Sequence, residues 1–110
     1  MKRDGSTLLL VGAGELGSRH LQGLAVVAAD EVLVVEPSPT ARDRAAARYL
    51  EVASPASPLL RFVDDVAAVD ARADVGIVAT GSLHRRAVVE GLAGAGVLPR
   101  RLVLEKFLFP

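Results

Sequence analysis

Short apolar segments alternate with segments of helical length along the chain. The apolar segments contain many leucine and β-branched residues and show little polar alternation, which is typical of strands that are buried on both faces. Pro55 and Pro58 place a loop before one of them, so we expect that segment to form an edge strand. The pattern predicts strands at residues 7–11, 32–35, 59–63 (the edge strand), 75–79 and 101–104.

Two of the intervening segments predict helices by their periodicity and composition. Apolar residues between Leu16 and Ala28 recur on one face of a helix. Residues 40–49 are rich in Ala and Arg, which are good helix formers, and either Ser38-Pro39 or Thr40 supplies the start. We therefore expect a helix after each of the first two strands.

The second half of the chain carries signals for one long and one short helix. Ser82 is the predicted N-cap of a helix over residues 83–95, and Gly96 is expected to end that helix in a left-handed conformation. A short helix is expected at residues 66–69, with its cap supplied by one residue of the Asp64-Asp65 pair.

The order of these elements predicts the fold class. Parallel strands need crossover connections, and right-handed crossovers pack helices onto the sheet. We expect an α/β fold: a doubly wound, mainly parallel, five-stranded Rossmann-type sheet in the order 3-2-1-4-5, with helices on both faces. Residues 1–110 are expected to form one domain.

A glycine-rich motif joins the first predicted strand to the first predicted helix. In a G-x-G-x-x-G motif with these flanks, the first glycine allows a tight turn and the second lets the backbone approach a pyrophosphate. The third lets the helix pack closely on the strand, and the free N–H groups of the helix start face the phosphates. These residues predict a dinucleotide-binding loop formed by Gly12-Ala13-Gly14-Glu15-Leu16-Gly17.

An acidic residue stands where such a loop needs one. Glu36 ends the second predicted strand, 19 residues after Gly17, where a carboxylate accepts hydrogen bonds from the adenosine ribose. The alternative is a solvated strand end. A carboxylate at this position repels a 2′-phosphate, so NAD is favoured over NADP, although Arg42 or Arg44 could turn toward a phosphate.

Composition and charge exclude several classes of function. The 110 residues include 13 basic and 13 acidic residues and no cysteine. Without a basic block there is no electrostatic basis for a nucleic-acid partner or a polybasic membrane contact. No apolar run is long enough to cross a membrane. The lack of cysteine leaves no disulfide or thiolate metal site, and two histidines do not make a zinc site, so the cytoplasm is the expected compartment and no metal is expected.

Three stretches resemble the Gfo/Idh/MocA family of oxidoreductases. Residues 11–24 resemble the family's opening glycine loop and leucine-rich helix. Residues 78–84 resemble its segment at the fourth strand, where a turn precedes a histidine, and residues 102–106 resemble the fifth strand that ends in Glu-Lys-Pro. The three stretches occur in the expected order and together extend over the whole chain.

The resemblance implies a nicotinamide-dependent domain of an enzyme that acts on a sugar or polyol. It implies that Lys106 is the catalytic lysine that assists proton transfer at the reacting hydroxyl, and that Glu105 positions it. It also implies that Ala79, Thr80 and His84, with Gly81 in the same turn, lie along the cofactor. The chain departs from the family at Gly81 and Phe107, where proline is usual.

The length limits what this chain does by itself. A two-domain enzyme of this kind needs roughly 250–350 residues, so we expect the cofactor-binding domain without its substrate domain and no turnover by the chain alone. The alternative is a non-enzymatic sensor or assembly module that binds a dinucleotide and pairs with another chain or forms a homodimer. A further alternative is the same fold with another ligand, such as coenzyme A or a nucleoside monophosphate.

Overall fold

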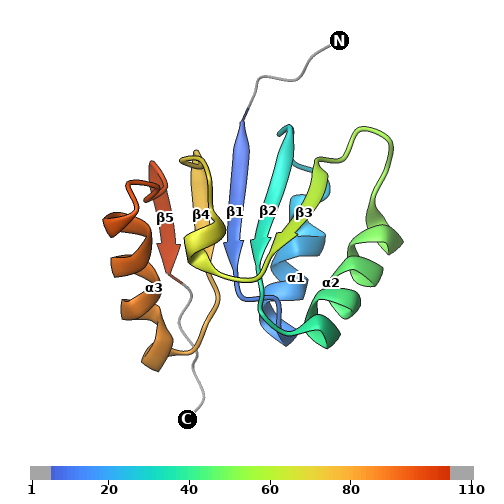
Figure 1. The fold of residues 1–110 in the computed structure, drawn as a ribbon. Coiled ribbons are helices and arrows are strands. Elements are labelled where there is room, and N and C mark those ends of the chain that lie inside the picture. Colours follow the sequence, from blue (N-terminus) through green and yellow to red (C-terminus); the bar gives the residue numbers. More distant parts are fainter. Residues whose placement is uncertain (1–5, 105–110) are drawn as a thin grey trace.

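The computed structural model describes residues 6–104, with the exception of the side chains of Glu15, Leu16, Ser82 and Leu83. Within this range five strands form one sheet (Figure 1). The strands are β1 (Thr7–Val11), β2 (Glu31–Val35), β3 (Leu59–Val63), β4 (Val75–Val78) and β5 (Arg101–Leu104).

The strand order is β3-β2-β1-β4-β5, and every neighbouring pair is parallel. At the centre of the sheet Leu9 is in register with Leu33 on one side and with Gly76 on the other. The predicted order 3-2-1-4-5, the parallel sheet and the edge position of residues 59–63 are therefore confirmed.

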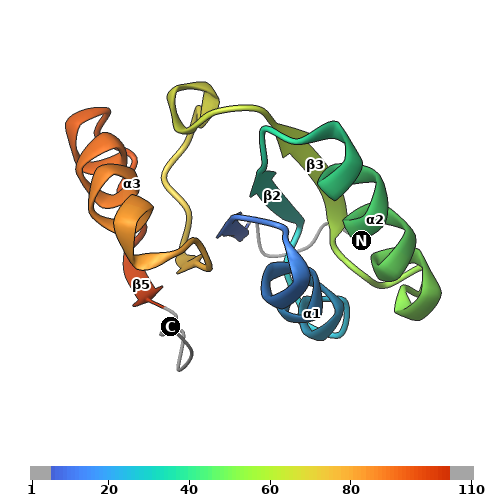
Figure 2. The ribbon, with the colours of Figure 1, turned by 90° about the horizontal axis from the view of Figure 1, so that it is seen from below.

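Helices cover both faces of the sheet (Figure 2). The helices α1 (Glu15–Leu24) and α2 (Pro39–Val52) lie side by side on one face, and α3 (Ser82–Gly94) and the single 3-10 turn η1 (Val66–Ala68) lie on the other. None of the helices within residues 6–104 is long and apolar enough to span a membrane.

The sheet separates two hydrophobic clusters, and the central strand contributes to both. Leu8 and Leu10 of β1 join the cluster beneath α1 and α2, whereas Leu9 and Val11 join the cluster beneath α3 and η1. Because successive side chains of a strand point to opposite faces, a strand covered on both sides has no position for a polar residue. This explains the unbroken apolar run from Leu8 to Val11, which follows the partly exposed Thr7 at the start of β1.

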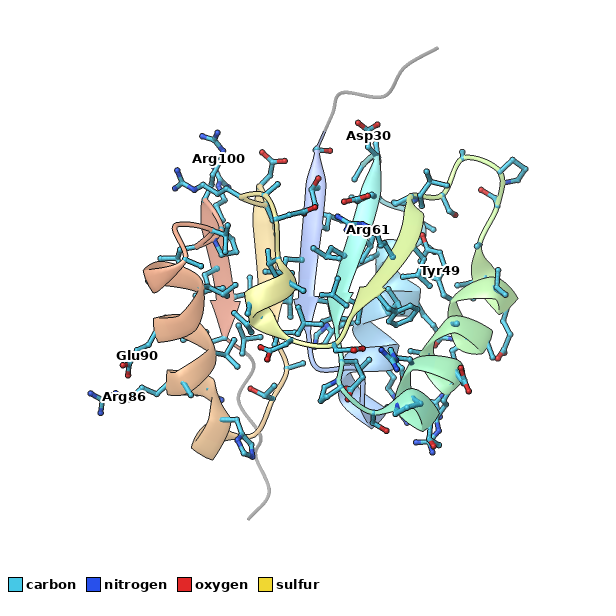
Figure 3. The ribbon with its side chains drawn as sticks, viewed as in Figure 1. Asp30, Tyr49, Arg61, Arg86, Glu90 and Arg100 are labelled. Carbon is cyan, nitrogen blue, oxygen red and sulfur yellow. The ribbon has the colours of Figure 1, made fainter. Side chains whose placement is uncertain are left out.

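Polar contacts connect α1 to α2. The Arg48 guanidinium donates to Oγ of the buried Ser18 at 2.6 Å, and the Gln22 side chain donates to the Arg48 carbonyl at 3.1 Å. Tyr49, buried between α2 and the sheet, donates its hydroxyl hydrogen to the Pro58 carbonyl at 2.7 Å (Figure 3). These bonds fix α2 against both α1 and the loop that leads into β3.

The edge strand β3 carries one charged side chain between two carboxylates (Figure 3). Arg61 donates to Glu31 at 3.1 Å and to Asp70 at 3.3 Å. Hydrogen bonding to Glu31, then to Asp70, raises the pKa of the Arg61 guanidinium above its usual value. The three side chains are exposed enough for solvent to screen the pairs, so they contribute little to stability.

The first helix ends earlier than its apolar pattern predicts. It stops at Leu24, and the amides of Ala25 and Val27 then bond to carbonyls three residues back, which makes turns. Val27 and Ala28, the last residues of the predicted stripe, are exposed, whereas Ala25 and Ala29 are buried in the cluster below α1. The second helix is longer than predicted and runs three residues beyond Tyr49.

The predicted caps are confirmed at two helices and wrong at the third. Ser38 Oγ accepts from the Ala41 amide at 3.2 Å, and Asp65 caps η1 by accepting from the Ala67 amide. Gly81, rather than Ser82, is the N-cap of α3, and glycine has no side chain to cap the helix. Gly96 ends this segment with φ +73°, as predicted.

Candidate functional site

A groove of about 440 Å³ opens at the carboxyl ends of the central strands. Its walls include Gly12 after β1, Glu36 after β2, and Thr80 and His84 around the start of α3. The crossovers of a doubly wound sheet diverge between β1 and β4, and this is where such sheets bind ligands. Four of the residues singled out in the sequence therefore lie around one groove.

The backbone ladder of the sheet continues into the loops that form this groove. The Gly12 amide donates to the Val35 carbonyl, the Glu36 amide to Val63, and the Ala79 amide to Val11, each at 2.9 Å. Each of the three loops is thus tied to a neighbouring strand at its first residue.

The first glycine of the motif makes a turn that disfavours other residues. Gly12 has φ +94°, a conformation that side chains with a Cβ rarely adopt. A Cβ there would also lie 3.1 Å from Cγ2 of Thr80 and 3.3 Å from the backbone carbon of Ala79. The chain therefore turns sharply from β1 toward α1 while it packs against the residues that follow β4.

The third glycine brings α1 onto this turn. A Cβ on Gly17 would lie 2.0 Å from the carbonyl oxygen of Gly12. Backbone atoms cannot move aside as a flexible side chain can, so this contact requires glycine. The sequence-based reason for Gly17, close packing of helix on strand, agrees with this contact.

The second glycine meets no such restriction from the protein. A Cβ on Gly14 would have no neighbouring atom within 4 Å, and Gly14 is exposed at the N-cap of α1. The Ser18 amide donates to the Gly14 carbonyl at 2.8 Å. In any α-helix the amides before that bond find no carbonyl acceptor within the helix. The free backbone amides at the start of α1 therefore lie next to the open space beside Gly14.

Glu36 is held against the glycine loop. Only 9% of this residue is exposed. Its Oε1 accepts from the Ala13 amide at 2.7 Å, and its Oε2 accepts from the Ser38 amide at 3.0 Å. A carboxylate offers about four acceptor positions, so each oxygen retains one. The alternative of a solvated strand end is wrong, because the carboxylate is buried and joins the glycine loop to the start of α2.

The other site residues from the sequence lie close to the loop or outside the described range. Ala79 is buried behind the glycine loop, Gly81 is exposed, and His84 is exposed on the groove wall. Thr80 has a buried Oγ1 that makes no hydrogen bond within the described part of the chain. The predicted roles of Glu105 and Lys106, and of the Glu15 and Leu16 side chains, fall outside what the structure describes.

The structure adds groove residues that the sequence reasoning treated only as helix caps or did not name. Asp64 and Asp65 follow β3 directly and line the groove, and Asp64 forms an ion pair with Arg42 of α2. Val66 and Val88 contribute apolar wall. The signal for the two aspartates was their position, because the carboxyl ends of parallel strands meet at one edge of a sheet.

The fold and the arrangement of the loops define a Rossmann-type α/β domain, and solved structures share it. A proposed NADP oxidoreductase from Bacteroides fragilis aligns over 96% of this chain and 38% of its own, with a TM-score of 0.69 and 17% identity. Saccharopine dehydrogenase (L-Glu forming) from Saccharomyces cerevisiae aligns over 96% and 23%, with a TM-score of 0.62 and 20% identity. Lactate dehydrogenase from Eimeria maxima, solved with NADH and oxamate, aligns over 87% and 32%, with a TM-score of 0.55 and 13% identity.

A curated protein is similar in sequence. Glutamyl-tRNA reductase 2 from Anaeromyxobacter dehalogenans strain 2CP-C is 37% identical over 79 residues, which make up 72% of this chain and 16% of that protein. The chain thus spans about a sixth of the length of this relative. No family model matches the chain. Membership of the Gfo/Idh/MocA family is not confirmed, and glutamyl-tRNA reductase belongs to a different family.

Proposed function

We propose that this domain binds a nicotinamide dinucleotide, NAD in preference to NADP, as part of an oxidoreductase. The observation that carries the proposal is the placement of the buried Glu36 carboxylate against the Ala13 amide, beside the open space at Gly14. A carboxylate that would accept from the ribose hydroxyls is thereby held beside backbone amides that would bind a pyrophosphate. The Rossmann-type neighbours, whose names include NADP and NADH, support the same proposal.

The residues present fit such a ligand. The amides at the start of α1 and the partial positive charge of that helix end would bind the pyrophosphate, and Gly14 leaves room for it. The unused acceptor positions of Glu36 would bind the ribose hydroxyls. Thr80 and His84 lie on the same groove and would border the ligand farther along. The bound nicotinamide would supply hydride-transfer chemistry.

We propose that the whole oxidoreductase acts on a sugar or polyol, as the resemblance of three stretches to Gfo/Idh/MocA proteins implies. Lys106 would then be the catalytic residue and Glu105 its positioning partner. Reduction of a glutamyl-tRNA is the second candidate, and it rests on the 37% identity to the reductase of that name. The two candidate substrates are distinguished by assaying the whole oxidoreductase with polyols and with glutamyl-tRNA and measuring the change in the oxidation state of the nicotinamide. A dinucleotide-binding sensor or assembly module would show binding and no turnover with either.

The direct test is titration of the purified chain with NADH and with NADPH, in which nicotinamide fluorescence reports binding. We expect saturable binding of both, with the tighter binding for NADH. No binding of either at millimolar concentration would overturn the proposal. Equal loss of both affinities on replacement of Glu36 would overturn the assignment of Glu36 to the ribose.

The variants are chosen to separate recognition from folding. Glu36→Ala leaves the Ala13 amide without its acceptor, so Glu36→Gln serves as the second variant because its amide oxygen still accepts one bond. Both should weaken NADH more than NADPH. Glu51→Gln, which removes the same charge from an exposed position near the end of α2, should leave both affinities unchanged.

A further inference from the structure

The groove has an acidic end between β2, β3 and α2. Three carboxylates line it: Glu36 after β2, and Asp64 and Asp65 after β3. Two of them are engaged by backbone amides, Glu36 at the glycine loop and at Ser38, and Asp65 at the start of η1. Asp64 differs, because its partner is a cation.

That cation is Arg42, in the first turn of α2. Its guanidinium pairs with the Asp64 carboxylate across the gap between α2 and the end of β3. The Arg42 side chain is 26% exposed, whereas that of Asp64 is 76% exposed, so the arginine is the more buried partner of the pair. The ion pair connects one wall of the groove to the start of α2.

The pairing decides what this end of the groove offers to a ligand. A guanidinium can bind a phosphate through two parallel hydrogen bonds, so arginine is the residue best suited to bind a 2′-phosphate. While Arg42 is paired with Asp64, one nitrogen of the guanidinium is engaged and its charge is balanced, and the three carboxylates leave the groove end with a net negative charge. A dianionic 2′-phosphate is then repelled, whereas the neutral ribose hydroxyls of NAD are accepted.

We propose that Asp64 is a specificity-determining residue, which selects NAD over NADP by holding Arg42 in this ion pair. The proposal rests on dinucleotide binding at this groove as given above. It assigns the selection to a residue after β3, in addition to Glu36 at the end of β2. Removal of the Asp64 charge frees Arg42 for the 2′-phosphate and lowers the negative charge in the same step.

The experiment compares NADH and NADPH affinities of the full chain and of Asp64→Asn. Asparagine has nearly the same shape at a largely exposed position, so the fold is retained. We expect NADPH to bind about tenfold more tightly, the effect of one close charge near a protein surface, and NADH to change by less than about twofold. An unchanged ratio of the two affinities overturns the proposal.

Three further variants identify the arginine as the cause. The gain should be lost in Asp64→Asn with Arg42→Ala, because Arg42 is the cation paired with Asp64. It should be kept in Asp64→Asn with Arg44→Ala, which removes an equal charge from an exposed position two residues along α2. Asp43→Asn removes an exposed charge next to Arg42 and should produce no gain. A gain that survives the loss of Arg42 overturns the ion-pair role.

The outcomes also distinguish this inference from the function on which it rests. If the unmodified chain binds neither dinucleotide, the proposed function fails, and this inference fails with it. If the unmodified chain binds NADH and Asp64→Asn retains the same preference, only the role of Asp64 is overturned.

Discussion

The carbonyl oxygen of Gly12 occupies the place where a methyl group on Gly17 would project, at 2.0 Å from the Cβ position. This contact joins the two outer glycines of the motif and places α1 directly on the turn that follows β1. It makes the loop part of the packing of the domain as well as a candidate ligand site. Replacement of Gly17 and replacement of Gly14 should therefore have different effects.

Gly17→Ala should destabilise the fold strongly. The added methyl group meets backbone, and overpacking of this kind costs about 3 kcal/mol or prevents folding. Urea unfolding measures the effect. Gly23→Ala is the matched control, because it lies in the same helix with open space around its Cβ, and it should raise stability by up to about 1 kcal/mol. Equal stability of the two variants would contradict the packing role of Gly17.

Gly14→Ala should separate ligand binding from stability. Its Cβ points into open space, so the free energy of unfolding should fall by no more than about 1 kcal/mol, the usual cost of alanine at an N-cap. Dinucleotide affinity should fall at least tenfold, about 1.4 kcal/mol, because the methyl group blocks the approach to the pyrophosphate. Fluorescence titration and urea unfolding on one preparation test both. Undiminished affinity would remove Gly14 from the site.

Ser38→Ala should destabilise α2 without affecting dinucleotide binding. The substitution removes the hydroxyl that accepts from the Ala41 amide, at a cost of about 1 kcal/mol. The Ser38 backbone amide, which binds Glu36, remains in place. Thermal unfolding and NADH titration should show the loss in the first measurement alone. Ser38→Asn restores a capping acceptor and should recover most of the stability, and failure to do so would argue against the cap.

Tyr49→Phe should cost about 1–3 kcal/mol, the range for a buried acceptor that loses its donor. The variant keeps the aromatic packing but leaves the Pro58 carbonyl without the hydroxyl that now donates to it. Urea unfolding measures the change. Leu50→Ala, at the next position with 73% of the leucine exposed, should change stability by less than about 0.5 kcal/mol. A Tyr49→Phe variant as stable as the parent would show that the bond is not needed.

The strands could be predicted because each is formed by a local run of apolar residues, and their order follows from the crossover connections that parallel strands need. Residues 8–11 are apolar at every position since this part of β1 is covered on both faces, and this leaves a visible pattern in the sequence. The end of α1 could not be predicted in the same way. The predicted apolar stripe continues to Val27 and Ala28, but the helix ends at Leu24 and both residues are exposed. Beyond the helix Ala25 and Ala29 are buried instead, so the apolar spacing does not mark where the helix ends.

The parts of the candidate site that belong to a sequence motif could be predicted. The parts that depend on contacts between distant residues could not. The glycine loop and Glu36 have a characteristic spacing, and the structure brings both to one groove. The bonds from Ala13 and Ser38 to Glu36, and the pairing of Arg42 with Asp64, depend on how closely the loops approach one another. No local pattern encodes these distances, and Asp64 was accordingly interpreted as a helix cap.

The ladder bonds that carry the sheet into its loops have a consequence for dynamics. Gly12, Glu36 and Ala79 each donate an amide hydrogen to a neighbouring strand. These three bonds can break only when the adjoining end of the sheet opens, so the amides should exchange with solvent only through large-scale unfolding. Loops that are already ordered lose little conformational entropy when they bind a ligand. The loops of the groove lose their conformational entropy when the domain folds, before a ligand binds.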